Sequence, residues 1–111
     1  MAEHSINFSD FLASPEADCL WGLVYGKQCA QAAKVGAHLL AHDSLVVVVD
    51  ASRLSAVSDS FIKGFFDPAF RLLQTKERVR ERIRIQGGHY YERLIEKNWT
   101  ILAALYHAKR H

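Results

Sequence analysis

The sequence has 111 residues, of which 50% are hydrophobic and 23% are charged, as expected for one globular domain with its own apolar core. The formal net charge of +2 is too small to indicate a nucleic-acid-binding protein by itself. There is no apolar run as long as a membrane span and no signal-peptide pattern at the start, so we expect a cytoplasmic protein of bacterial type. Cys19 and Cys29 lack a metal-binding or redox spacing and are interpreted as free thiols.

The first part of the chain predicts a strand, an ambiguous segment and a helix. Ile6-Asn7-Phe8 is compatible with a short strand. Within residues 14–26, Ser14-Pro15-Glu16 has the signals of a helix start, whereas the apolar run 20–25 resembles a strand. Residues 27–42 are predicted to form one helix, because small and apolar side chains recur at helical spacing and would let it lie close to a sheet.

The middle of the chain predicts a buried strand followed by a helix. Residues 45–49 form a β-branched run that is typical of a strand covered on both faces. A short helix is predicted from Phe61 to about Phe66. Because proline removes a backbone donor and disfavours helical geometry before it, we expect a kink at Pro68, or a new helix with Asp67 as its cap.

The last part predicts an edge strand and a final helix. Residues 82–86 alternate between polar and apolar, which favours a half-buried strand at or near an edge. After the turn at Gly87-Gly88, residues 89–106 have helical periodicity. Strands that alternate with helices predict a small α/β sandwich, with a mostly parallel or mixed sheet of about four strands and helices packed on it.

The loop after the valine strand is the first candidate for a functional site. In open α/β sheets, binding sites lie at the carboxyl ends of strands, next to helix amino termini. Ser58 or Asp59 can cap the helix that follows, which is a purely structural role. The same position can instead present a charge or a phosphorylatable hydroxyl group to a partner.

The stretch VVVVDASRLSAVSDSF, residues 46–61, resembles the central motif of STAS domains, which occur in sulphate transporters and anti-sigma-factor antagonists. In that family a hydrophobic strand leads through a short loop to an Asp-Ser-Ser/Thr-Gly turn and a helix. The ending Ser60-Phe61 is similar to the STAS-like branch of unknown function. The resemblance covers roughly residues 27–106 and is carried by this short motif.

The resemblance implies a non-catalytic regulatory module that binds a protein partner, such as a kinase-type ATPase or an anti-sigma-like factor. The implied contact residues are Ser55, Ser58, Asp59, Ser60 and Lys63. Asp59 occupies the position of the phosphorylated serine of the antagonists, and Ser58 and Ser60 flank it as candidate phosphorylation sites. The loop is therefore either a binding surface that phosphorylation does not control or a permanent mimic of the phosphorylated state.

The alternative hypothesis is a nucleic-acid- or phosphate-binding protein that uses the basic segment from Arg71 to Arg84. Its candidate contacts alternate along the chain: Arg78, Arg80, Arg82 and Arg84. Acidic residues interrupt the segment, which is also typical of ordinary surface ion pairs, and no aromatic residue suited to base stacking lies among them.

Catalytic and metal chemistry have weaker signals in the sequence. His38 and His42 lie four residues apart on a predicted helix, but the sequence indicates no third ligand, so we expect no metal and no cofactor. Neither a paired base and nucleophile nor a glycine-rich phosphate loop is evident. We therefore expect that the protein is not an enzyme.

Overall fold

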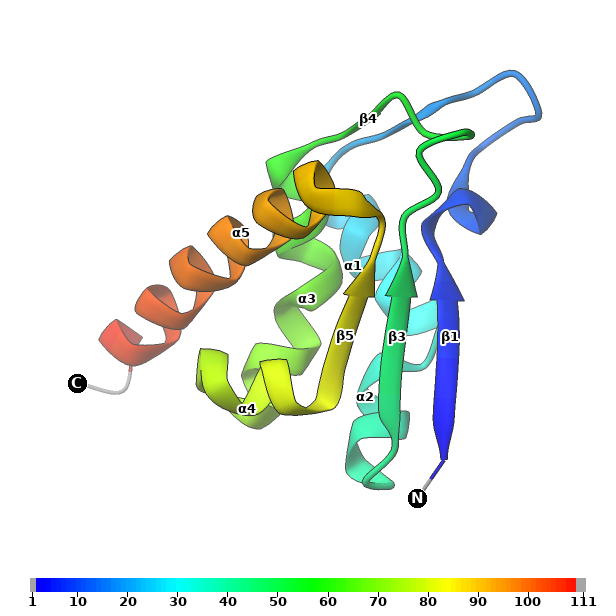
Figure 1. The fold of residues 1–111 in the computed structure, drawn as a ribbon. Coiled ribbons are helices and arrows are strands. Elements are labelled where there is room, and N and C mark those ends of the chain that lie inside the picture. Colours follow the sequence, from blue (N-terminus) through cyan, green and yellow to red (C-terminus); the bar gives the residue numbers. More distant parts are fainter. Residues whose placement is uncertain (1, 110–111) are drawn as a thin grey trace.

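The computed structural model describes residues 2–109, which form an α/β sandwich as predicted (Figure 1). The main sheet is parallel, with the strand order β1 (Glu3–Asn7), β3 (Ser44–Val48), β5 (Ile83–Gln86). A second, two-stranded parallel sheet joins β2 (Cys19–Leu20) to β4 (Ala56–Val57). The helical elements are η1 (Phe8–Phe11), α1 (Leu23–Ala32), α2 (Val35–Leu40), α3 (Asp59–Leu73), α4 (Lys76–Arg82) and α5 (Gly88–Lys109). The parallel arrangement is confirmed, but the predicted sheet of about four strands is divided into two smaller sheets.

Strand β3 is central but is covered by helices on one face. Leu45 and Val47 belong to the hydrophobic core, and α1, α2 and α3 lie behind the sheet in Figure 1. Val46 points to the other face, where no helix of the described chain lies in front of the sheet. Its neighbours on the adjacent strands are Ser5 and Arg84. The strand is buried as predicted, since Val46 is only 3% exposed, but helices cover only one of its two faces (Figure 1).

The predicted helix 27–42 is two helices. Lys34 adopts a left-handed conformation with φ of 57°, which ends α1 and begins α2. The small residues of α1 bring it against α3 rather than close to the sheet. A Cβ added to Gly26 would lie 2.9 Å from the backbone nitrogen of Phe65, and one added to Gly64 would overlap the carbonyl oxygen of Leu23. The two helix backbones touch at these glycines because neither has a side chain.

Helix α3 continues from Asp59 to Leu73 through Pro68, so the predicted end near Phe66 and restart at Asp67 were wrong. Pro68 lacks the N–H that would bond to the carbonyl group four residues earlier, a loss that costs about 3 kcal/mol in a helix interior. Burial of the aromatic face on both sides of the proline offsets this cost. The buried side chains of that face are Phe61, Ile62, Phe65, Phe66, Ala69 and Phe70.

The ambiguous segment 14–26 becomes a turn, a short strand and a helix start. No helix begins at Ser14, and the apolar run contributes only Leu20 to a strand, which it forms with Cys19 before α1 starts at Leu23. Leu20 pairs with Val57, the residue before the cap of α3. The ambiguous segment therefore lies beside the predicted functional loop.

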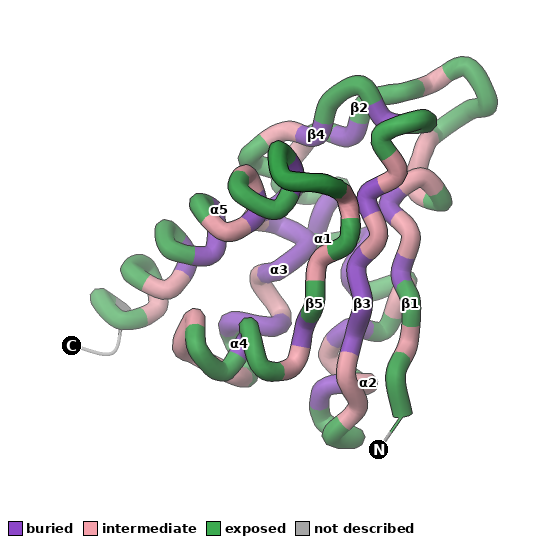
Figure 2. Tube along the Cα trace, viewed as in Figure 1, coloured by how far each residue is buried: buried purple, intermediate pink, exposed green. Residues whose placement is uncertain are grey.

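The core lies between the main sheet and the helices (Figure 2). Phe8 packs edge-on against Phe61 and Phe65, and Phe66 packs edge-on against Trp99 of α5. The predicted edge strand and final helix are confirmed as β5 and α5. None of the helices in residues 2–109 combines the length and apolar character that crossing a bilayer requires.

Candidate protein-interaction site

Ser58 caps the amino terminus of α3, as one of the two interpretations predicted. Its hydroxyl oxygen accepts a hydrogen bond from the backbone N–H of Phe61 at 3.1 Å. The same oxygen accepts from the backbone N–H of Gly22 at 3.4 Å and lies 3.1 Å from the hydroxyl oxygen of Ser60. Ser58 is half-buried, whereas Ser60 is exposed. The Ser58 hydroxyl group therefore has a structural role, whereas Ser60 remains exposed.

Asp59 joins the start of α3 to α5. Its Oδ1 accepts a hydrogen bond from Asn98 Nδ2 at 2.8 Å and lies 3.3 Å from Lys97 Nζ. The Asn98 bond, with the charges of Lys97 and Lys63, holds the pKa of Asp59 below its ordinary value. Asn98 is fully buried, whereas the side chain of Asp59 remains half-exposed. Asp59 therefore has an internal partner while one side of its carboxylate faces solvent.

The loop between β3 and β4 is held by hydrogen bonds, some within the loop and one to Asp18. Asp50 Oδ1 accepts from the backbone N–H and the hydroxyl group of Ser52, and these bonds lower the pKa of Asp50. Ser55 donates to Asp18 Oδ2 at 2.6 Å, which is the largest cause of the lowered pKa of Asp18. Of the predicted contact residues, Ser58, Asp59 and Ser60 lie together at the start of α3, and Lys63 is one turn further on. Ser55 is tied to the residue before β2 instead.

An exposed apolar patch beside this helix start was missed by the sequence analysis. We call Trp21, Leu23, Val24 and Tyr25 the Trp21 patch; Trp21 is 73% exposed and Val24 66%. With Phe11 and Leu20, among others, these residues line a groove of about 560 Å³. The patch adjoins the start of α3, because the backbone N–H of Ser58 donates to the carbonyl oxygen of Leu20 at 2.8 Å. The signal in the sequence that could have revealed this patch was the spacing of Trp21 and Tyr25, which are four residues apart.

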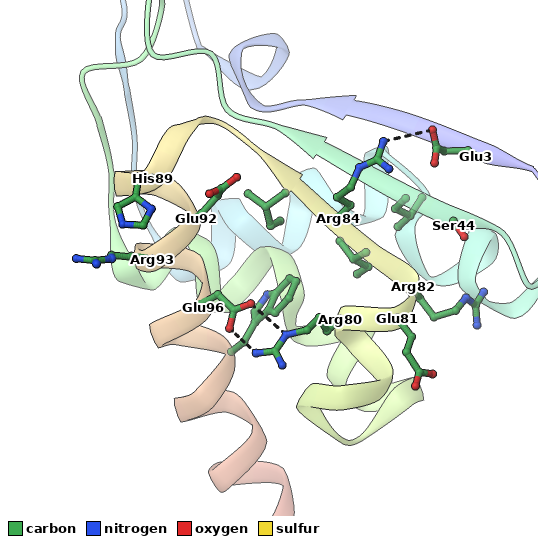
Figure 3. A pocket seen from close by; sticks show the side chains of 14 residues that line it. Glu3, Ser44, Arg80, Glu81, Arg82, Arg84, His89, Glu92, Arg93 and Glu96 are labelled. Atoms are coloured by element: carbon green, nitrogen blue, oxygen red, sulfur yellow. Dashed lines mark hydrogen bonds and ion pairs between the residues drawn. The ribbon is translucent and has the colours of Figure 1, made fainter.

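The basic segment lies along a different groove, of about 610 Å³, between β5 and α5 (Figure 3). Arg80 makes two hydrogen bonds to the carboxylate of Glu96, at 2.8 and 3.3 Å. Arg84 reaches across the sheet toward Glu3 at 3.8 Å. Acidic side chains thus neutralise two of the candidate cations, and the groove does not present a uniformly positive surface.

Arg82 is half-buried and points toward the end of α2. Its Nε and Nη2 donate to the carbonyl oxygen of Asp43 at 3.1 and 2.6 Å, and Nη2 also donates to that of Leu39 at 2.9 Å. These carbonyl groups belong to the end of α2 and the turn before β3. The geometry therefore favours a structural role for Arg82. The other three predicted contacts, Arg78, Arg80 and Arg84, are exposed.

The predicted histidine pair is separated by the fold. His42 is exposed in a turn with φ of 63°, whereas His38 faces His4 and Asp43. His38 therefore has two further potential metal ligands beside it, His4 on β1 and Asp43 before β3. Sequence spacing could not reveal the whole group, because His4 is more than thirty residues away from both His38 and Asp43.

Comparisons with protein-family models, curated proteins and solved structures give no match for this chain. The class of protein follows from its own geometry. It is a small α/β domain in which an exposed aromatic and aliphatic patch adjoins a polar helix start. Its function is inferred from that arrangement.

Proposed function

We propose that the protein is a non-catalytic regulatory module that binds a partner protein at the Trp21 patch and the adjacent start of α3. The observation that carries this proposal is the exposure of Trp21 and Val24 next to the exposed Ser60. Contiguous apolar surface rimmed by polar groups marks interaction sites, and tryptophan and tyrosine are enriched at their energetic centres.

The two parts of the site have different roles in the proposal. The Trp21 patch supplies apolar area whose burial drives association. Ser60, Asp59 and Lys63 form a polar rim that orients the partner through hydrogen bonds and charge. Because Asp59 is held by Asn98, its carboxylate has a defined position before the partner arrives. Such preorganisation reduces the entropy that is lost on binding.

The resemblance to anti-sigma-factor antagonists suggests a kinase-type ATPase or an anti-sigma-like factor as the partner. Exposure favours Ser60 over Ser58 as a phosphorylation site, since the Ser58 hydroxyl group caps α3. A phosphate on Ser60 would lie at the positive end of the α3 dipole. It would also add charge beside Asp59 and thereby change the rim of the proposed interface.

The test compares two apolar-to-charged variants at opposite ends of the molecule. Val24→Asp alters the Trp21 patch, and Leu40→Asp is the matched control, because Leu40 is 68% exposed at the end of α2 (Figure 1). The tagged proteins are used to capture partners, and one identified partner is then purified and titrated by calorimetry. We expect Val24→Asp and Trp21→Ala to weaken binding at least about tenfold, as expected for hot-spot residues, while Leu40→Asp binds like the wild type.

Equal affinity of the wild type, Val24→Asp and Trp21→Ala for the purified partner would contradict the proposal. The alternative function would be favoured by binding to DNA or RNA that weakens steeply with added salt, persists in Val24→Asp and is lost in Arg78→Ala.

A further inference from the structure

Three potential metal ligands meet at the end of the sheet that is opposite the Trp21 patch. His4 lies on β1, His38 on α2, and Asp43 immediately precedes β3. His4 Nε2 is 2.9 Å from Asp43 Oδ2, and His38 Nδ1 is 3.4 Å from the same oxygen. In residues 2–109 this is the one group of three or more such side chains with the ligand atoms this close, all within 4.8 Å of one another.

These separations match those of a metal site. Two ligands of a tetrahedral zinc ion lie about 3.3 Å apart when each is about 2.05 Å from the metal. Two imidazole nitrogens with one carboxylate oxygen are a common ligand set for zinc and for other divalent transition metals. Two of the three observed separations are close to this value, and the two imidazole nitrogens, which lie within 4.8 Å of each other, would approach one ion by rotation of the rings.

The fold positions Asp43 before any ligand arrives. Its Oδ1 accepts a hydrogen bond from the backbone N–H of Ala2 at 3.2 Å, which leaves Oδ2 directed at the two imidazole rings. Its backbone carbonyl oxygen accepts from Arg82, and its N–H donates to the carbonyl oxygen of His38 at 3.0 Å. Contacts of this kind around a ligand orient it and are a regular feature of metal sites.

The two imidazole rings are stacked with their centroids 3.8 Å apart, and both face a groove of about 320 Å³ along the free edge of β1. The three side chains are partly buried, with Asp43 the least exposed. A metal ion held by them would therefore keep access to solvent for a fourth ligand. An ordinary hydrogen-bonded aspartate needs one histidine partner, whereas here two histidines from different elements converge on one oxygen.

We propose that His4, His38 and Asp43 form a binding site for a divalent transition-metal ion of the zinc class, with one coordination position open to solvent. This site is separate from the proposed interface and does not depend on it. Because its ligands come from β1, α2 and the start of β3, a bound ion would cross-link the elements at this end of the sheet. Binding of the ion to the folded state alone would raise the stability of the protein.

The test uses the full chain after chelator treatment and dialysis, with Zn²⁺ and Co²⁺ as probes. We expect calorimetry to give one Zn²⁺ per chain with Kd below about 10 μM, and Co²⁺ to produce a visible absorption spectrum of a site with nitrogen and oxygen ligands. Loss of one outer-shell contact commonly weakens metal binding by about 10–100-fold, so removing a direct ligand should weaken it by at least about 100-fold. His4→Ala, His38→Ala and Asp43→Asn should each show this loss.

The matched control is His42→Asn, which removes a neighbouring exposed histidine and keeps a residue type that tolerates its positive φ. It should bind Zn²⁺ like the wild type. If a ligand variant fails to fold, Zn²⁺-induced shifts of the histidine ring signals in wild-type NMR spectra replace it, and only those of His4 and His38 should move. The proposal is overturned if the wild type shows no saturable binding, if the ligand variants bind equally well, or if other histidine signals move instead.

Discussion

Single residues at the ends of the elements determine how this fold is joined together. Arg82 is the clearest case, because one guanidinium group donates to the carbonyl oxygens of both Leu39 and Asp43. These carbonyl groups lie where α2 ends and β3 begins, at the negative end of a helix. A residue that the basic sequence pattern suggested for nucleic-acid contact thus connects the end of α4 to α2.

We expect Arg82→Ala to lower the free energy of unfolding by about 2–3 kcal/mol, because hydrogen bonds from a charged donor contribute about 1.5–3 kcal/mol and two partly buried carbonyl groups would lose this donor. Arg82→Lys should recover only part of this loss, since an ammonium group lacks the planar fork. Urea denaturation measures both. Arg78→Ala, on the exposed side of α4, is the control and should change stability by less than about 0.5 kcal/mol. Equal effects of Arg82→Ala and Arg78→Ala would contradict the structural role.

Asp59 links stability to pH. Its pKa is lowered in the folded state by the Asn98 bond and by Lys97 and Lys63, so the unfolded chain binds more protons near the ordinary carboxyl pKa of about 3.9. Its contribution to stability is therefore complete above that pH and is lost as the pH falls through the lowered folded-state pKa. We expect Asp59→Asn to make the acid side of the stability profile shallower.

The measurement is denaturant unfolding of the wild type and Asp59→Asn at a series of pH values from neutral to acid. NMR titration of the Asp59 carboxyl group in the wild type and in Asn98→Ala provides the independent check. The pKa of Asp59 should rise toward its ordinary value when the Asn98 donor is removed. Superimposable stability profiles for the wild type and Asp59→Asn would show that this carboxylate is not linked to folding.

At the scale of the elements, the contact between α1 and α3 is the most sensitive packing in the fold. The two helices meet at Gly26 and Gly64, where a methyl group would reach the backbone of the opposite helix. A backbone atom cannot move aside as the end of a flexible side chain can. The aromatic face of α3 is positioned against the sheet through this close approach.

We expect Gly64→Ala to destabilise the protein by about 2 kcal/mol, because overpacking against a backbone reaches about 3 kcal/mol and the gain in helix propensity returns only about 1 kcal/mol. Gly36→Ala in α2 is the matched control, since its added Cβ would lie 3.9 Å from Leu72 Cδ1, an ordinary contact. Without a clash, that variant should be stabilised by about 0.5–1 kcal/mol. Thermal and urea unfolding give both values, and a neutral Gly64→Ala would refute the close helix contact.

Over the whole molecule, the buried helix α3 contrasts with the end that carries β2, β4 and the loop before β4, which we call the lightly held end. Helix α3 is buried along its aromatic face, whereas β2 and β4 pair over two residues each, and the loop before β4 is largely exposed. The proposed interface lies at this lightly held end. The proposed metal ligands lie at the other end of the sheet (Figure 1).

Hydrogen exchange tests this separation. Amide protons of α3 from Phe65 to Phe70 should exchange slowly, in events close to global unfolding, and those of residues 50–57 should exchange early through local opening. Partner binding should then slow exchange at the proposed interface, and Zn²⁺ should slow it at the opposite end. Uniform protection over the whole chain would contradict a lightly held end.

The order of the elements was largely predictable because it depends on local periodicity. The strands near residues 6, 45–49 and 82–86, the final helix and the Ser58 cap each follow from residues that are close in sequence. The break at Lys34 and the continuous helix through Pro68 were not predictable. Both depend on which faces meet across α1 and α3, and that burial outweighs a local preference.

The sequence by itself determined an α/β chain of alternating elements, with a polar helix start after a valine strand, because side-chain periodicity and capping act over a few residues. Only the tertiary structure decided that the Trp21 patch lies beside that helix start, that Arg82 bonds to the end of α2 and that His4 meets His38 and Asp43. These relations join residues far apart in the chain, and their physical cause is the packing of helices and strands against one another, which local patterns do not encode.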